Sequence, residues 1–256
     1  TRTREVLQRA SVRFANSTYT AGLIEQFSGS SAVVTGCGLS PGVLQREVER
    51  SGPEAADDHD GVRASVGLSE GPVLSFLGRV VPDKNVEMLL HLAREMPGLQ
   101  VVVMGDGKDR RRLMDVSARL GLTARVHWLG LVPEAKKWEV LRASDVFCLP
   151  SRPNDEGSVE GFGIVLLEAT AAGTPVVAAR VGGMVDVVDE TTGALFDPDD
   201  VRDLQRAVER TLAHPDAARQ AVERLRQRIR DRYNWAAIAE HVLGRLHDAA
   251  PPDGAR

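Results

Sequence analysis

The sequence is poor in cysteine and in aromatic side chains, and it has no long apolar run. Its only two cysteines, Cys37 and Cys148, are far apart and have no metal-ligand spacing, which indicates a reduced, cytoplasmic setting and gives no sign of a metal site. No apolar stretch approaches the roughly 18 residues that a membrane-spanning helix needs, and no signal peptide is recognisable.

An excess of basic residues is also missing. The 256 residues carry a net charge of −4, which argues against a nucleic-acid partner, because such proteins usually show a basic footprint. With 43% hydrophobic residues, the chain can form one large or two smaller domains. It begins at Thr1 rather than Met, so we expect a fragment or a processed product.

Short apolar runs alternate with longer amphipathic segments in the middle of the chain, a pattern typical of a parallel, doubly wound α/β sheet. In such sheets ligands bind beyond the carboxyl ends of the strands. The predicted strands are Val73–Leu77, Gln100–Met104, Val126–Trp128, Val146–Leu149, Pro175–Ala178 and Ala194–Phe196, and the predicted helices are Asn85–Glu95, Asp109–Leu120, Glu134–Ala143 and Ile164–Ala172.

The two flanks follow different patterns. The front predicts one strand–helix–strand unit over Val12–Ala15, Thr18–Phe27 and Ala32–Val34, followed by a polar linker around Ser51–Gly61. The end predicts three helices without strands, over Asp200–Ala213, Pro215–Arg232 and Trp235–His247. We therefore predict a front unit over residues 1–50, a linker over 51–70, the α/β domain over 71–228, and a crossing helix and tail over 229–256.

The segment from Glu160 to Glu168 carries the most chemical information. Gly161 and Gly163 leave the backbone N–H groups at the start of a helix uncovered, and a helix start with free donors favours an anion such as phosphate. The two flanking carboxylates can accept hydrogen bonds from hydroxyls. Glu168 lies in an otherwise apolar helix, where a carboxylate needs partners. An anion between hydroxyl-bearing groups describes a nucleotide sugar.

Two glycine-containing loops are predicted at the same edge of the sheet. The loop after Val73–Leu77 begins with Gly78 and carries Arg79 and Lys84, whose cations suit phosphate oxygens. The loop after the next strand contains Gly105, which we interpret as a tight turn with close backbone approach to a ligand. The dinucleotide-binding motif G-x-G-x-x-G needs a third glycine, which this loop lacks. An oxidoreductase is therefore the least favoured function.

Taken together, these segments resemble the retaining glycosyltransferases of the GT-B fold, family 4 (glycosyl transferases group 1). The resemblance covers residues 70 to 215 and is most specific in the two glutamates with seven residues between them. It implies a Rossmann-like doubly wound sheet, the GT-B C-terminal domain, with extra C-terminal helices. The segments that carry it are Phe76–Arg79, Lys84–Asn85, Val103–Gly107, Val126–Gly130, Ala143–Val146, Leu149–Ser151, Glu160–Glu168 and Gly173–Ala178.

The resemblance also implies roles for single positions. Arg79 and Lys84 match the pair that holds the donor diphosphate, Glu168 the residue that grips the ribose, and Glu160 the residue that faces the hexose. Family members transfer a hexose from a UDP-, GDP- or ADP-sugar with retention of configuration and normally need no metal or other cofactor. The expected catalytic residues are Glu160, Arg79 and Lys84, and the expected donor-binding residues are Gly78, Arg79, Lys84, Gly105, Val126 (by its backbone, at the base), Glu160, Gly161, Phe162, Gly163, Ile164 and Glu168.

The front of the chain resembles only the closing strand–helix–strand of the family's first domain, which holds the acceptor. We therefore expect this chain to be the donor-binding half of a longer enzyme, with a truncated N-terminal domain, and to transfer little by itself. The acceptor is left open, and any membrane contact is expected only through that first domain. Two alternatives stay open: a non-catalytic module that binds a nucleotide or phosphosugar, and a nucleotide-sugar epimerase.

Overall fold

The computed structural model of the chain describes residues 2–50, 59–154, 157 and 159–249. Its centre is a six-stranded sheet in the order β5-β4-β3-β6-β7-β8, in which every neighbouring pair is parallel. The fold class expected from the sequence is confirmed. The strands are β3 (Val73–Leu77), β4 (Gln100–Met104), β5 (Val126–Gly130), β6 (Val146–Leu149), β7 (Val176–Ala179) and β8 (Ala194–Phe196).

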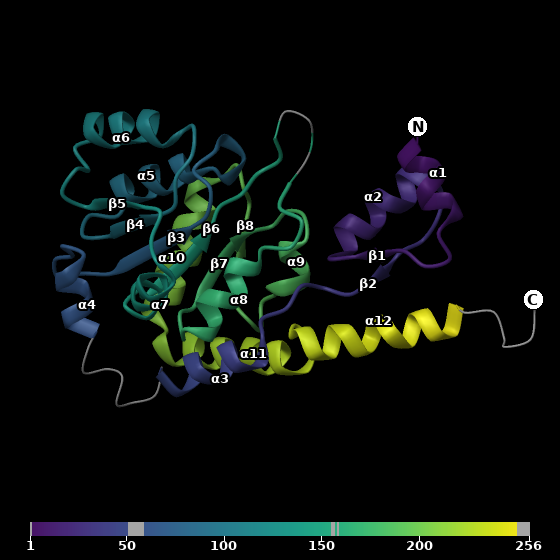
Figure 1. Ribbon diagram of the computed structural model, residues 1–256. Helices are drawn as coiled ribbons and strands as arrows, with labels where there is room; N and C mark the ends of the chain where they lie inside the picture. The colour runs from purple at the N-terminus through teal and green to yellow at the C-terminus, as the bar shows by residue number, and fades with distance from the viewer. Residues whose placement is uncertain (1, 51–58, 155–156, 158, 250–256) are drawn as a thin grey trace, which may run out of the picture.

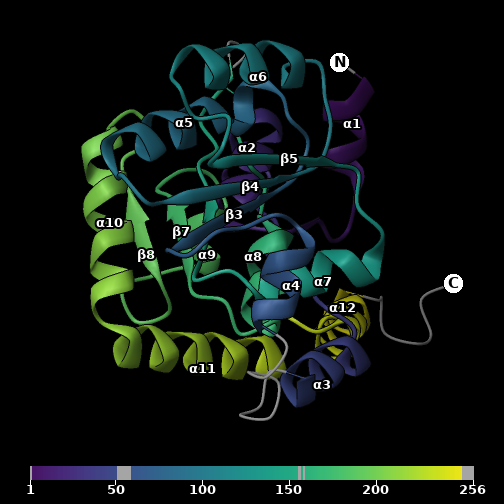
Figure 2. The same cartoon turned by 90° about the vertical axis from the view of Figure 1, so that its left-hand side faces the viewer.

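Helices cover both faces of this sheet, which explains why its central strands are apolar without alternation. All residues of β4, β6 and β7 are buried. Figure 2 shows α5, α6 and α10 on one side of the strands and α4, α7 and α8 on the other. These helices are α4 (His59–Ser65), α5 (Val86–Glu95), α6 (Arg110–Arg119), α7 (Glu134–Arg142), α8 (Ile164–Ala171) and α10 (Val201–Ala213), and the short α9 (Met184–Val187) follows β7.

A small unit at the front of the chain has its own two-stranded parallel sheet, as Figure 1 shows. It consists of α1 (Arg2–Arg9), β1 (Phe14–Ala15), α2 (Thr18–Ser28) and β2 (Val33–Val34). Ser17 caps α2 by accepting a hydrogen bond from the backbone N–H of Thr20 at 3.1 Å, and Gly29 ends the helix with φ 74°. The strand–helix–strand prediction is confirmed, and α1 is an addition that the sequence did not indicate.

The segment after β2, which the sequence analysis grouped with the front unit, packs on the main domain. Helix α3 (Pro41–Arg50) contacts α8, and Leu39 and Leu44 belong to the main hydrophobic core. Residues 51–58 of the expected linker lie outside the described residues. The rest of that linker includes α4, where Arg63 donates a hydrogen bond to Asp145 at 2.7 Å, so this part is helical and fixed to the domain.

The C-terminal helices α11 (Pro215–Asp231) and α12 (Trp235–Ala249) lead back toward the front unit, and α12 runs alongside it in Figure 1. Helix α11 continues past the boundary expected at residue 228. Leu39 and Trp235 meet at the crossing, where Leu39 donates to the carbonyl of Tyr233 at 2.9 Å and Trp235 donates to the carbonyl of Leu39 at 3.2 Å. Within the described part of the chain, no helix is long and apolar enough to cross a membrane.

Candidate functional site

The loops that leave β3, β4 and β5 are held together at the carboxyl edge of the sheet. Gly78 donates to the carbonyl of Met104 at 3.0 Å, and Gly105 donates to the carbonyl of Gly130 at 2.7 Å. A Cβ atom at Gly105 would lie 1.9 Å from the carbonyl oxygen of Gly78. The contact between neighbouring loops therefore requires glycine at residue 105, independently of the close approach to a ligand that the sequence suggested.

The turn from Glu160 into α8 is equally constrained. Gly163 precedes the helix with φ +83°, a conformation that L side chains rarely adopt. Behind the turn, Gly183 donates to the carbonyl of Glu160 at 3.0 Å, and a Cβ atom at Gly183 would lie 2.0 Å from the carbonyl oxygen of Gly161. Because Gly163 has no side chain, it cannot cap the N–H groups of the first turn, so the start of α8 offers donors to an anion.

The structure brings Lys84 and Glu160 together. Lys84 ends a short 3-10 helix after β3 (Pro82–Lys84), and its ammonium group forms an ion pair with the carboxylate of Glu160. Both side chains are largely buried, with 13% and 20% of their surface exposed. Asn85 follows with φ 50° and donates to the carbonyl of Pro198 at 3.3 Å, which fixes the end of this loop.

Glu168 is also paired, with a lysine that the sequence analysis did not single out. The ammonium of Lys137 lies 2.8 Å from Glu168 Oε1 and 2.8 Å from Glu134 Oε1, and 4.5 Å from the centre of the Trp138 ring. Burial by itself lowers the pKa of Lys137, but its hydrogen bonds to the two glutamates outweigh burial and raise this pKa above its ordinary value. Lys137 is therefore a fixed positive charge beside Glu168.

Arg79 is exposed on the loop after β3, and its guanidinium has no ion-pair partner within the described residues, so it is free for a ligand.

Val126 does not lie at the ligand edge: it pairs with Val101 at the amino end of β5 and is buried. Strand β5 continues to Gly130, two residues beyond the prediction, so Leu131, with 83% of its surface exposed, follows the carboxyl end of the strand instead.

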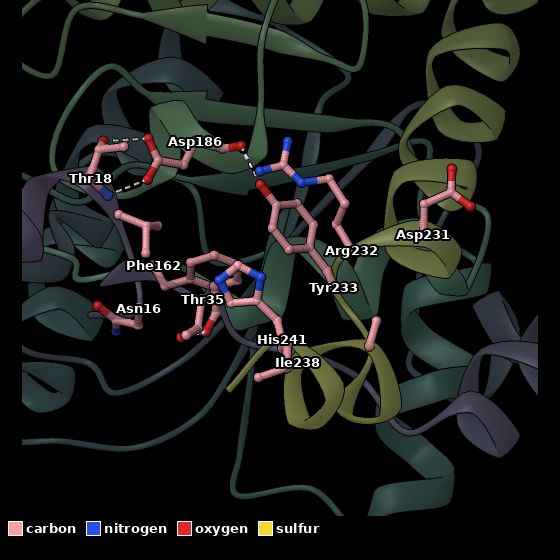
Figure 3. A pocket seen from close by; sticks show the side chains of 13 residues that line it. Asn16, Thr18, Thr35, Phe162, Asp186, Asp231, Arg232, Tyr233, Ile238 and His241 are labelled. Carbon is pink, nitrogen blue, oxygen red and sulfur yellow. Dashed lines mark hydrogen bonds between the residues drawn. The ribbon is translucent and has the colours of Figure 1, made fainter. Parts of the chain in front are cut away.

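The front unit reaches this turn from the other side. The N–H and hydroxyl of Thr18 each donate to the carboxylate of Asp186 at 2.6 Å, and a Cβ atom at Gly161 would lie 3.3 Å from the amide nitrogen of Asn16. A neighbouring cavity has a volume of about 380 Å³, and Figure 3 shows side chains that line it. Phe162 lies in its wall, and the ring of Phe162 makes an edge contact with Tyr233 at 5.3 Å between centroids.

The chemistry available at this edge follows from these groups. Arg79, Lys84 and the start of α8 are suited to an anion, while the carboxylates of Glu160 and Glu168 can accept hydrogen bonds from hydroxyls. Gly78, Gly105 and Gly161 shape the backbone around them, and Ile164 begins the helix with an exposed side chain. Among the described residues, no group of three or more His, Cys, Asp or Glu side chains could hold a metal ion.

Comparison with known proteins agrees with this architecture. The sequence model of the family described as "Glycosyl transferases group 1" matches residues 60–228, and the chain belongs to this family. It is 34% identical over 239 residues to the GDP-mannose-dependent alpha-(1-6)-phosphatidylinositol monomannoside mannosyltransferase of Mycolicibacterium smegmatis, a match that covers 90% of this chain and 61% of that protein. The D-inositol 3-phosphate glycosyltransferase of Saccharomonospora viridis is 35% identical, over 82% of this chain and 49% of that protein.

Solved structures show the same fold. The sucrose-phosphate synthase of Thermosynechococcus elongatus superposes with a TM-score of 0.78 and 27% identity, over 97% of this chain and 61% of that one. The Anabaena protein HepE in complex with UDP and glucose superposes with a TM-score of 0.81 over 96% of this chain and 66% of that one, and its 22% identity shows likeness of fold alone. The chain thus spans about half to two thirds of the proteins it resembles here.

Proposed function

We propose that this chain is the donor-binding half of a retaining glycosyltransferase, which transfers a hexose from a nucleotide-diphosphate sugar to an acceptor. The observation that carries the proposal is the arrangement at the carboxyl edge of the sheet. There the start of α8 lies between two glutamates, Glu160 and Glu168, and each of them is paired with a lysine. Membership of the glycosyl transferases group 1 family supports this assignment.

In the proposal the diphosphate of the donor is bound by Arg79, Lys84 and the backbone N–H groups at the start of α8. Lys84 is paired with Glu160. A diphosphate offers Lys84 a competing, more highly charged partner, and the fork of Arg79 suits two phosphate oxygens. The backbone of Phe162, Gly163 and Ile164 is assigned to the sugar and phosphate, and Glu168 to the ribose hydroxyls.

Transfer in this proposal depends on stabilising the leaving group. As the bond between the anomeric carbon and the diphosphate breaks, negative charge grows on the phosphate oxygens, and Arg79, Lys84 and the start of α8 offset it. Glu160 orients the hexose and stabilises positive charge at its ring. The acceptor hydroxyl attacks from the face that the diphosphate leaves, the departing phosphate takes its proton, and the configuration is retained. In the proposal these groups neutralise the negative charge of the diphosphate, and no metal ion takes part.

The nucleotide, hexose and acceptor are also proposals. The Mycolicibacterium relative is named as GDP-mannose-dependent, which makes a GDP-hexose a donor to test beside UDP- and ADP-hexoses. The acceptors named for the relatives are inositol compounds that carry phosphate, free or lipid-linked, and we propose the same chemical class for the enzyme to which this chain contributes. The proposed setting is cytoplasmic, in keeping with two free cysteines.

Calorimetric titration with UDP-, GDP- and ADP-sugars tests this function, with Arg79→Ala and Glu168→Ala as site variants. We expect the chain to bind one class of donor and each substitution to weaken that binding about tenfold or more, as loss of a hydrogen bond to a charged group does. Unchanged affinity in both variants would refute the site. Donor binding that never leads to transfer, even beside an intact acceptor domain, would instead favour a non-catalytic binding module.

A further inference from the structure

Lys137 is buried beside the proposed ribose site and has no place in the proposed chemistry. It lies in the first turn of α7, the helix that follows β5, and only 11% of its side chain is exposed. Burying an ammonium group is costly unless carboxylates surround it, and both of its carboxylate partners are within 2.8 Å. A buried lysine held between two carboxylates suggests a specific role at the site.

The contact between Lys137 and Glu168 involves a single carboxylate oxygen. Lys137 Nζ binds Oε1 of Glu168, and within the described residues no other side chain shares that carboxylate. A carboxylate has about four lone-pair positions on its two oxygens, so one contact with lysine leaves room for two hydroxyl donors. The pairing therefore holds the carboxylate in one rotamer and leaves Oε2 open.

Lys137 is also fixed by a second carboxylate, that of Glu134. Glu134 accepts hydrogen bonds from Lys137 Nζ and from the indole nitrogen of Trp138, both at 2.8 Å, and the ammonium lies over the Trp138 ring. Hydrogen bonds from Lys137, and to a smaller extent from Trp138, hold the pKa of Glu134 below its ordinary range. The chain of contacts from Trp138 through Glu134 and Lys137 to Glu168 gives the ammonium little freedom to move.

We propose that Lys137 is a positioning residue of the donor site, which fixes the Glu168 carboxylate in the orientation that accepts both vicinal hydroxyls of the donor ribose. The inference rests on the proposed function, because it needs a nucleotide at this edge of the sheet. Lys137 acts through Glu168 and does not touch the reacting atoms. Pre-orienting a hydrogen-bonding group in this way raises the affinity for the ligand that needs that orientation.

The alternative is that Lys137 only ties α7 to α8. A purely structural tie would weaken all nucleotides equally when it is lost, whereas a positioning role changes the preference for ribose hydroxyls. The decisive quantity is therefore a ratio: the affinity for a nucleoside diphosphate divided by the affinity for its 2′,3′-dideoxy form. This ratio is unaffected by a general loss of stability, provided that the variant is folded.

The experiment is a calorimetric titration of the full chain with UDP, GDP and ADP, followed by the 2′,3′-dideoxy form of the one that binds most tightly. We expect the wild-type ratio to be tenfold or more, and Glu168→Ala to reduce it to about one. Lys137→Met, which keeps an unbranched side chain but removes the ammonium group, should reduce the ratio at least threefold, and Lys137→Arg should restore part of it. Lys136→Met is the matched control, since among the described residues the ammonium group of Lys136 forms polar contacts with Glu139 and Ser65 and none with Glu168.

Three outcomes separate the two proposals. If no nucleoside diphosphate binds the wild-type chain, the proposed function fails and the inference fails with it. If the chain binds and Glu168→Ala removes the ribose preference while Lys137→Met keeps it, the inference alone is overturned. If Lys137→Met does not fold, Lys137→Gln replaces it, and a ratio unchanged from wild type overturns the inference in the same way. The double variant of Lys137 and Glu168 should lose no more preference than Glu168→Ala alone.

Discussion

The ammonium group of Lys84 is paired with the carboxylate of Glu160, although 76 positions separate the two residues in the sequence. In the proposed function the two residues have different roles: Lys84 binds the diphosphate and Glu160 orients the hexose. The two side chains satisfy each other, so neither partly buried charge is left unpaired. In the proposal, the diphosphate of the donor competes with Glu160 for Lys84, which makes the two residues energetically coupled.

This coupling predicts that substitutions of Lys84 and Glu160 differ in their effect on nucleotide binding. Lys84→Met should weaken the binding of a nucleoside diphosphate about tenfold or more, because it removes a charge-assisted hydrogen bond to phosphate. Glu160→Gln should leave that affinity unchanged or raise it, because it releases Lys84 from its internal partner. Titration of both variants with the same nucleoside diphosphate checks the prediction. Equal weakening by both substitutions would contradict it.

The glycines behind the Glu160 turn provide a second prediction, on stability. Gly183→Ala should destabilise the chain by about 2 kcal/mol or more, because the new Cβ atom would lie 2.0 Å from a backbone oxygen. Gly244→Ala, in the exposed middle of α12 with nothing within 4 Å, should instead stabilise it by about 0.5–1 kcal/mol. Denaturant unfolding of both variants measures the difference, and similar values for the two would show that the turn is not packed in this way.

Most of the central sheet could be predicted from the sequence. Its strands are short apolar runs such as Val73–Leu77 and Val146–Leu149, and burial on both faces gives them an unmistakable composition. The helices that were missed lack that signal. Helix α1 has no buried residue, and the short α9 has only four residues. Helix α3 is rich in polar residues. It joins the main domain through contacts with α8, a helix that is far from α3 in the sequence.

Asp186 provides a third prediction, on the front unit. Its carboxylate accepts two hydrogen bonds from Thr18 at the start of α2, where a negative charge stabilises a helix. Asp186→Ala should lower the protection of the amides of Thr18–Ser28 against hydrogen exchange by about 1 kcal/mol. Asp216→Ala removes a highly exposed partner of Arg219 and is the control. It should leave the protection of the same amides almost unchanged. Unchanged protection in Asp186→Ala would mean that this contact does not hold the unit.

Asp189 predicts how stability depends on pH. Burial by itself raises the pKa of Asp189, but hydrogen bonds from Thr191 and Arg228 outweigh burial and hold this pKa well below its ordinary value. A lowered pKa in the folded state adds stability above the unfolded value of about 3.9, and this stability is lost as the pH falls toward the folded value. Asp189→Asn should therefore lower the free energy of unfolding at pH 7, with a smaller difference from wild type at pH 3. A difference that grows on acidification would contradict this assignment.

The candidate site was only partly predictable. Glu160, Glu168, Arg79 and Lys84 could be selected because their residue types and order suggest a ligand. Lys137 could not, since its contact with Glu168 spans 31 positions and joins two helices, α7 and α8, that are separated by β6 in the sequence. The position of Val126 within β5 could not be predicted, because the sequence does not show where the strand ends; its register with β4 puts Val126 at the amino end.

The central claim is that a nucleotide sugar binds between the β3 loop and the start of α8. The most direct test is a crystal structure of the chain with the nucleoside diphosphate that binds most tightly. The account predicts phosphate oxygens within hydrogen-bond distance of Lys84, Arg79 and the first N–H groups of α8, with the ribose hydroxyls on Glu168. A nucleotide bound elsewhere, such as in the cavity lined by Arg180, Arg210 and His214, would contradict it.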